Sequence, residues 1–136
     1  MKQYDWSVRV YYEDTDAGGV VYYANYLKFM ERARSEWLRS LGVEQDMLRQ
    51  TSGVLLMVHS LTMNYLRSAR FNDQLQVSVA VKVMGRAKVT FHQQITCADN
   101  LLCQGDVTIV CVDEKSGKPI GFPEELKQAF QGVLIA

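Results

Sequence analysis

Residues 23–41 read YANYLKFMERARSEWLRSL, and this stretch decides the fold. Apolar side chains recur in it at steps of four, three, four and four residues, at Tyr26, Met30, Ala33, Trp37 and Leu41. This period is typical of a helix with one buried face. Charged side chains occupy the opposite face, and Gly42 follows where a helix-ending glycine belongs. The stretch therefore predicts a long amphipathic helix that packs against another layer.

The segments on both sides of this helix alternate with the period of two that is typical of β-strands. One strand is expected before the helix, over residues 6–12. Four are expected after it, over residues 54–66, 74–83, 88–97 and 102–113, followed by a short helix over residues 123–131. Short turns separate the later strands, so consecutive strands should pair antiparallel. The βαββββ order predicts an α+β domain in which an antiparallel sheet wraps around one long helix.

Length and composition fit a single globular domain over residues 1–136. At 15.5 kDa and 48% apolar residues, the chain can bury a core without a disulfide or a metal, and disorder is excluded. Fifteen basic residues cancel fifteen acidic ones. This balance argues against a nucleic-acid partner, which calls for a basic excess, and it leaves no net charge to oppose self-association.

Location and metal content are predicted from what the sequence lacks. No apolar run approaches the ~20 residues of a membrane span, and the first residues hold no apolar signal core, so we expect a cytoplasmic protein. Three cysteines without a CxxC pair are expected to be reduced core residues: Cys97, Cys103 and Cys111. With only His59 and His92 added, we expect no metal site.

The segment just before the long helix has the chemistry of a reactive site. Residues 12–26 read YEDTDAGGVVYYANY, which places carboxylates and glycines ahead of the first helical amides. Those amides lack partners inside the helix, and the helix dipole favours negative charge beside them. A carboxylate and an oxyanion site are the parts that acyl transfer needs. Ordinary helix capping explains the same residue types, and composition alone favours capping.

The pattern D-x-D-x-x-G-V-V-Y-Y-x-N-Y, from Asp14 to Tyr26, resembles the signature of hotdog-fold acyl-CoA thioesterases of the 4-hydroxybenzoyl-CoA thioesterase class. With the run FMERAR at residues 29–34, the chain is most similar to the bacterial acyl-CoA thioesterases associated with the Tol-Pal system. The resemblance covers nearly the whole chain, because βαββββ is also the order of the hotdog fold. It implies hydrolysis of an acyl-CoA to free acid and CoA. No separate cofactor is implied, since coenzyme A is part of the substrate.

The resemblance also implies which residues act. The second Asp of D-x-D falls on Asp16, which would serve as general base or nucleophile. The amide at the helix start falls on Tyr23 and would polarise the thioester carbonyl. A thiol leaving group with a pKa of ~8.5 makes a general acid unnecessary. Glu31 is the main rival, because another hotdog branch uses a helical Glu; a structural role on a solvated helix face with Lys28 and Ser35 is preferred for it.

Binding residues are implied in the same way. The phosphates of coenzyme A call for a basic cluster, and the hairpin residues Arg86 and Lys88 are favoured over the alternative cluster at residues 67–70. Leu56 and Met57 match positions of the acyl pocket, although they fit plain core equally well. His59 on the same strand is assigned to substrate binding, with an interface residue or a dehydratase histidine as alternatives.

The sequence leaves two other functions open and also predicts an oligomer. A non-catalytic module that binds acyl groups or acyl carrier protein in envelope or phospholipid assembly is the second hypothesis, and a hotdog dehydratase is the third. Acyl carrier protein is accordingly an alternative partner to acyl-CoA. Strand 54–66 is too apolar to stand as a free edge, so we expect a homodimer paired through it. We further expect two such dimers to form a homotetramer. The resemblance implies that this strand pairs across a two-fold axis, with the active sites at the subunit boundary.

Overall fold

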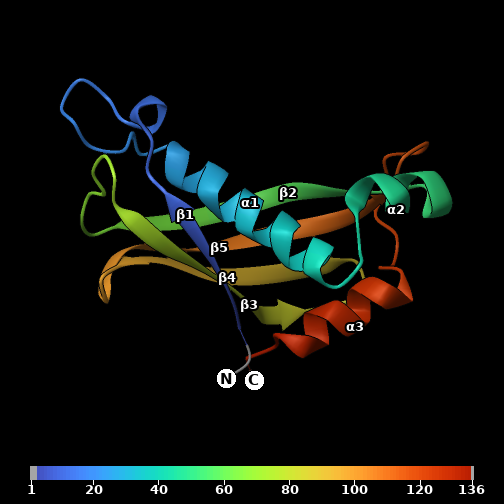
Figure 1. Ribbon diagram of the computed structural model, residues 1–136. Helices are drawn as coiled ribbons and strands as arrows, with labels where there is room; N and C mark the ends of the chain where they lie inside the picture. The colour runs from blue at the N-terminus through green and yellow to red at the C-terminus, as the bar shows by residue number, and fades with distance from the viewer. Residues whose placement is uncertain (1–2, 136) are drawn as a thin grey trace.

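A curved antiparallel sheet and one long helix form the two main layers of the protein, in a computed structural model that describes residues 3–135 (Figure 1). The strands are β1 (Tyr4–Arg9), β2 (Val54–Tyr65), β3 (Gln74–Met84), β4 (Lys88–Cys97) and β5 (Asn100–Asp113). They lie in the order β1-β3-β4-β5-β2, so β1 and β2 are the edges. Helix α1 (Asn25–Ser40) crosses one face. The predicted α+β architecture and βαββββ order are confirmed, while residues 1, 2 and 136 of the expected domain lie outside the described residues.

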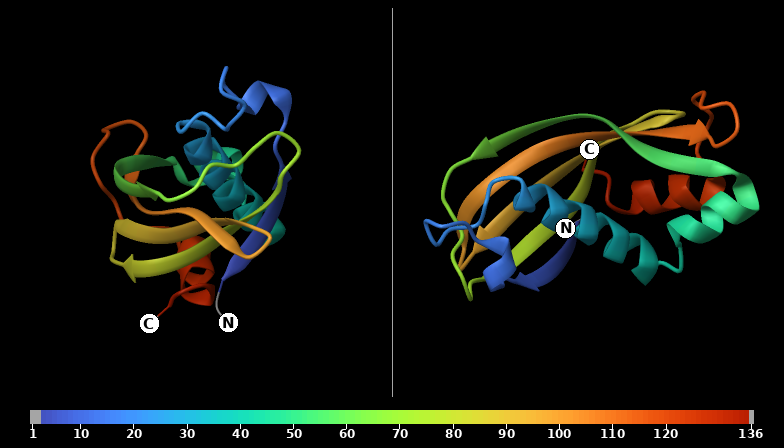
Figure 2. Two further views of the ribbon diagram at one scale, coloured as in Figure 1. Left: turned by 90° about the vertical axis from the view of Figure 1, so that its left-hand side faces the viewer. Right: turned by 90° about the horizontal axis from the view of Figure 1, so that it is seen from above.

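The sheet curls around α1, as the end-on view in Figure 2 shows. The buried face of α1 follows the predicted period, and Phe29, Met30 and Ala33 have no exposed surface. The inward side chains of β3 and β4 meet this face, among them Val77 and Ile95, which are also fully buried. The apolar contact between helix and sheet is therefore what holds the two layers together.

The structure corrects the first strand. β1 covers Tyr4–Arg9 rather than residues 6–12, and the chain then forms a short 3₁₀ turn over Tyr12–Asp14. The Asp14 carboxylate accepts the Tyr11 N–H at 2.9 Å. An acidic side chain that captures a backbone donor competes with the β-ladder, which is why the strand stops early.

Two further helices flank the sheet. α3 (Glu124–Gly132) is the predicted short helix, and it begins and ends one residue later than predicted. α2 (Gln45–Ser52) was not predicted, because Leu48 is its only buried residue and gives no apolar period. Within residues 3–135, no helix is long and apolar enough to cross a membrane.

The three cysteines lie in strands, as expected, and none of them forms a disulfide within the described chain. Cys103 and Cys111 are buried, and Cys97 is half-buried. Burial raises the pKa of the Cys103 thiol to about 12, so this thiol stays protonated and unreactive at neutral pH.

A buried polar network fastens α1 to the sheet. Gln93 has no exposed surface, and its Nε2 donates to the Met30 and Ser78 carbonyl oxygens at 3.1 Å each. Its Oε1 accepts a hydrogen bond from Arg34 Nη1 at 2.7 Å. These three bonds join a helix carbonyl, a strand carbonyl and a helix guanidinium through one side chain. Gln93 therefore fixes the position of Arg34 as well as the distance between the layers.

Gly105 in β5 allows the edge strand β2 to pack closely, and Gly105→Ala should destabilise the protein. A Cβ at this position would lie 2.6 Å from the Thr62 carbonyl oxygen and would also overlap Met63. Forcing a methyl group into such a contact costs about 1–3 kcal/mol. Gly132→Ala is the control, because a Cβ there meets nothing within 4 Å. Thermal melting should show a lower Tm for Gly105→Ala only; equal melting of the two variants would contradict this account.

Candidate active site

The loop between β1 and α1 lies at the N-terminal end of the helix and contains a short hairpin after its 3₁₀ turn (Figure 1). Thr15 and Val21 pair across it, and the Asp16 N–H donates to the Val20 carbonyl at 2.9 Å. The Gly19 N–H donates to the Asp16 carbonyl at 3.0 Å. Gly19 has a φ of 79°, a backbone conformation that favours glycine. These bonds fix the backbone of Asp16 at the base of the tip.

The Asp16 side chain is exposed and lightly held. Its Oδ1 accepts the Gly18 N–H at 2.8 Å, and a Cβ on residue 18 would come within 3.2 Å of that oxygen. Within residues 3–135, Oδ2 accepts no hydrogen bond, and no cation lies within ion-pair distance of the carboxylate. One carboxylate oxygen is thus positioned by the loop, while the other has no protein partner and can meet a substrate or water.

The start of α1 presents backbone donors without acceptors. Ala24 is the N-cap, and no side chain hydrogen-bonds to the helix end there. Among the described residues, the N–H groups of Tyr23 and Ala24 have no acceptor, whereas the Tyr22 N–H donates to the Asp14 carbonyl at 3.2 Å. Asp16 therefore does not cap this helix, which removes the main structural alternative to a chemical role. The free amides form the positive end at which an oxyanion would be stabilised.

Tyrosines connect the helix start to the end of β2. The rings of Tyr23 and Tyr65 meet edge to face at 6.1 Å, and the Tyr65 hydroxyl donates to the Tyr23 carbonyl at 3.4 Å. Burial raises the pKa of Tyr65, so its hydroxyl is a proton donor at neutral pH. Sequence analysis did not single out Tyr65, whose only signal was an aromatic residue at the end of an apolar strand.

The predicted binding residues lie far from the loop within one chain. Lys88 of β4 and Met57 of β2 both pair with Val110 of β5, whereas Tyr65 of β2 pairs with Cys103 of β5. Val110 and Cys103 are seven residues apart along β5, which is roughly 23 Å at ~3.3 Å per residue. A single chain therefore does not bring Lys88 or Met57 to Asp16 and Tyr23.

The alternative basic cluster is the one beside the loop. Arg70 forms a bridge with Val20, and the Val21 N–H donates to the Ala69 carbonyl at 2.9 Å. By contrast, Arg86 is in the exposed turn between β3 and β4, where its carbonyl accepts the Phe122 N–H at 2.9 Å. Within one chain, proximity thus favours residues 67–70 over the hairpin that sequence analysis preferred.

His59 lies at an irregularity of the edge strand. The register of β2 against β5 shifts between Val58 and Ser60, so His59 sits on a β-bulge and is exposed. Met57 is exposed as well, while Leu56 is half-buried. The described part of the chain offers no group of three or more His, Cys, Asp or Glu that could hold a metal ion.

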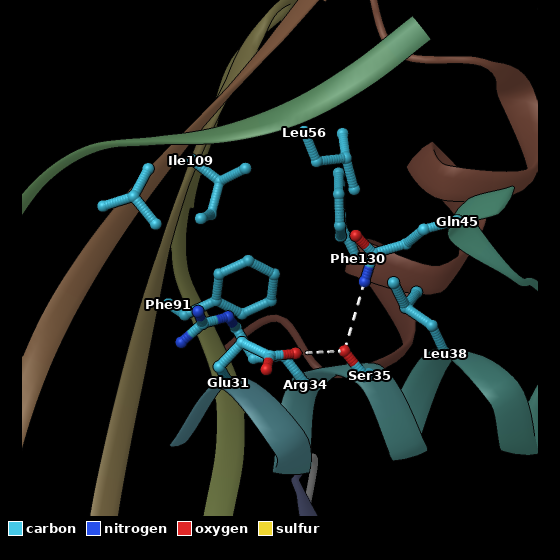
Figure 3. A pocket seen from close by; sticks show the side chains of 10 residues that line it. Glu31, Arg34, Ser35, Leu38, Gln45, Leu56, Phe91, Ile109 and Phe130 are labelled. Atoms are coloured by element: carbon cyan, nitrogen blue, oxygen red, sulfur yellow. Dashed lines mark hydrogen bonds between the residues drawn. The ribbon is translucent and has the colours of Figure 1, made fainter. Parts of the chain in front are cut away.

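Glu31 and Leu56 line a pocket between α1 and the β2 side of the sheet (Figure 3). The pocket has a volume of about 110 Å³ and does not include Asp16. The Glu31 Oε2 accepts the Ser35 hydroxyl at 2.6 Å, which is the contact expected for its structural role. The rival carboxylate is therefore engaged with a neighbour on its own helix, one turn further along.

Comparisons with known proteins identify the family. The model of the thioesterase-like superfamily matches residues 10–130. Acyl-CoA thioesterase YbgC of Haemophilus influenzae is 42% identical over 127 residues, covering 93% of each chain. The crystal structure of a probable thioesterase from Bartonella henselae is 32% identical, with a TM-score of 0.84 over 89% of this chain and 99% of that one. Slr0204, a 1,4-dihydroxy-2-naphthoyl-CoA thioesterase from Synechocystis, has the same fold, with 21% identity and a TM-score of 0.89 over 95% of this chain and 96% of that one. The chain thus belongs to the thioesterase-like superfamily, and it is a hotdog-fold thioester hydrolase.

Proposed function

We propose that the protein hydrolyses acyl-CoA to free acid and CoA, with Asp16 as the catalytic carboxylate. The observation that carries the proposal is that one loop holds both a partly unpartnered carboxylate and the free amides of Tyr23 and Ala24. The names of the related acyl-CoA thioesterases support the substrate class.

The reaction needs only these groups and water. Asp16 either takes a proton from water as the water oxygen attacks the thioester carbon, or attacks that carbon itself; in the second case the departure of CoA leaves an anhydride, which water then opens to regenerate Asp16. The negative charge that develops on the carbonyl oxygen is met by the Tyr23 amide. The carbon–sulfur bond then breaks and CoA leaves as a thiolate, which needs no general acid because its thiol pKa is ~8.5.

A second copy of the chain would complete the site. The edge strand β2 exposes apolar side chains, with Met57 52%, Val58 54% and Leu61 43% exposed. Two β2 strands paired antiparallel about a two-fold axis would cover them. The same pairing would bring the N-terminal half of the partner's β2, and the Arg86–Lys88 end of its sheet, to the Asp16 end of this protomer. The large separation within one chain therefore supports the homodimer.

Four further proposals concern the assembly, location and partners of the protein. They are a homotetramer of two such dimers, a cytoplasmic location, a link to the Tol-Pal envelope system, and acyl carrier protein as an alternative acyl donor. The second function, a binding module without activity, would use the same loop and fold. No observed contact favours it, and the unpartnered Asp16 oxygen favours hydrolysis.

Thiol release from acyl-CoAs of graded chain length tests the proposal directly. The expected result is steady release of CoA that depends on enzyme concentration and is lost on heating past the melting transition. Calorimetric binding of acyl-CoA or of acyl carrier protein, without any thiol release, would instead establish the binding module.

Alanine at Arg86 or Lys88 should raise KM for acyl-CoA more than it lowers kcat. A phosphate contact far from the thioester is felt about equally in the ground and transition states, so it appears in KM. The increase should shrink as salt rises. Arg67→Ala and Arg70→Ala test the cluster beside the loop, and Lys115→Ala in an exposed turn is the control. An unchanged KM for both hairpin variants at low ionic strength, with an increase for Arg67→Ala or Arg70→Ala, would reassign the contact.

A further inference from the structure

The asparagine at the start of α1 has no role in the proposed mechanism, yet its side chain is bonded to the reactive loop. Asn25 is the first residue of the helix and is half-buried. Its Nδ2 donates to the Asp14 carbonyl oxygen at 2.9 Å. A carbonyl oxygen can only accept, so this partner fixes which end of the side-chain amide faces the loop. The bond thus joins the helix to the segment that leads into Asp16, two residues further on.

The Asp14 carbonyl holds the two sides of the loop together. Besides the Asn25 side chain, it accepts the Tyr22 N–H at 3.2 Å, which is the longer of the two bonds. Asp14 lies two residues before the carboxylate of Asp16. Tyr22 lies one residue before the amide of Tyr23. The bonds that meet at this oxygen therefore relate the position of the carboxylate to that of the amide.

The backbone of Asn25 acts on the same amide. Its N–H donates to the Tyr22 carbonyl at 2.8 Å, and that carbonyl belongs to the peptide group that carries the Tyr23 N–H. A hydrogen bond accepted at a peptide oxygen polarises the group and strengthens its N–H as a donor. Any substitution other than proline leaves this backbone bond in place, so changing the Asn25 side chain tests its bond to Asp14 alone.

We propose that Asn25 is a positioning residue for the hydrolysis, and that its side chain sets the place of the Asp16 carboxylate relative to the Tyr23 amide. This inference rests on the proposed function and adds a residue to it. Within residues 3–135, the carboxylate accepts only the Gly18 N–H, so its alignment with the helix depends on the loop backbone. In that part of the chain, the Asn25 bond is the only side-chain hydrogen bond between the loop and α1.

Asn25→Ala should lower kcat for acyl-CoA about tenfold and leave KM within about twofold, because a misplaced reacting group weakens the transition state more than substrate binding. Alanine has a higher helix propensity than asparagine, so a residue that served only the helix would leave kcat unchanged. Asn25→Gln keeps the amide donor and should recover part of the rate. Asn100→Ala, in the exposed turn between β4 and β5, is the control and should keep the wild-type kcat.

A double-mutant cycle with Asp16→Asn shows through which group Asn25 acts. If the side chain works by placing the Asp16 carboxylate, Asn25→Ala should lower kcat little further once the charge of that carboxylate is gone. A full tenfold loss in the Asp16→Asn background would mean that Asn25 affects turnover by another route. That result would overturn the inference.

Amide hydrogen exchange gives a measurement that does not depend on activity. Peptides from residues 14–22 should exchange faster in Asn25→Ala than in the wild type, while those from β3 and β4 stay unchanged and show that the variant is folded. Unchanged exchange in the loop, or an unchanged kcat, overturns the inference and leaves the proposed function standing. If the wild type hydrolyses no acyl-CoA, the proposed function fails. Faster exchange would then still uphold Asn25 as the residue that orders the loop, and unchanged exchange would end that role too.

Discussion

Replacing Asp16 with asparagine should lower kcat for acyl-CoA by at least ~10²-fold, because it removes the charge that attacks the carbonyl or activates water. The fold should survive, since an asparagine Oδ1 can still accept the Gly18 N–H that Asp16 now accepts at 2.8 Å. Substrate binding should survive as well, because the free helix amides are unchanged. Thiol release measured beside a melting curve checks both statements.

Glu31→Gln is the matched control, since it removes the rival carboxylate, which lies on helix α1. The structure predicts a small effect on kcat, because Glu31 is exposed and already bonded to Ser35 on its own helix. If Glu31 were the catalyst, Glu31→Gln would abolish turnover and Asp16→Asn would leave it largely intact. If Asp16 were only a structural loop residue, Asp16→Asn would hardly change kcat. Full activity in Asp16→Asn would end the proposed mechanism.

Much of the fold was predictable because its elements carry strong local periods. The buried stripe of α1 and the alternation of β3 and β4 each repeat over at least ten residues, and their predicted bounds differ from the observed ones by two residues at most. α2 was missed because one buried leucine gives no period. The early end of β1 was missed because it depends on the Asp14 carboxylate competing for the Tyr11 N–H, which a period does not record.

The candidate site was predictable only where its parts are local in sequence. Asp16 and Tyr23 belong to one loop motif, and the structure shows a free carboxylate oxygen and a free amide there. The distance of Lys88 from that loop depends on the register of β4 and β2 against β5, which involves residues far apart in the chain. The bond between Arg34 and the buried Gln93 was not predicted either, because a charged residue on a helix is normally solvated and the two residues are far apart in the chain.

Breaking the β2 edge should remove activity without unfolding the protomer, and Leu61→Lys is the variant that tests this. Leu61 is opposite the buried Val107, so it faces the concave side of the sheet, yet it is 43% exposed because α1 does not cover it. In an isolated protomer, lysine at this exposed position should change stability by no more than ~0.5 kcal/mol. In an edge-to-edge dimer, the same lysine would lie against apolar groups of the partner and would cost far more.

We therefore expect the wild type to have at least twice the mass of one chain by light scattering at micromolar concentration, and Leu61→Lys to approach the 15.5 kDa of a single chain. The variant should lose nearly all thiol release, because Met57 and Lys88 can reach the Asp16 loop only from a second copy, given their separation within one chain. Val83→Lys is the control, since Val83 is 59% exposed but lies on β3, away from this edge. A wild-type mass near that of one chain would refute the dimer. A monomeric Leu61→Lys with full turnover would instead show that one protomer holds a complete site, and the basic cluster at residues 67–70, already beside the loop, would then be the CoA contact.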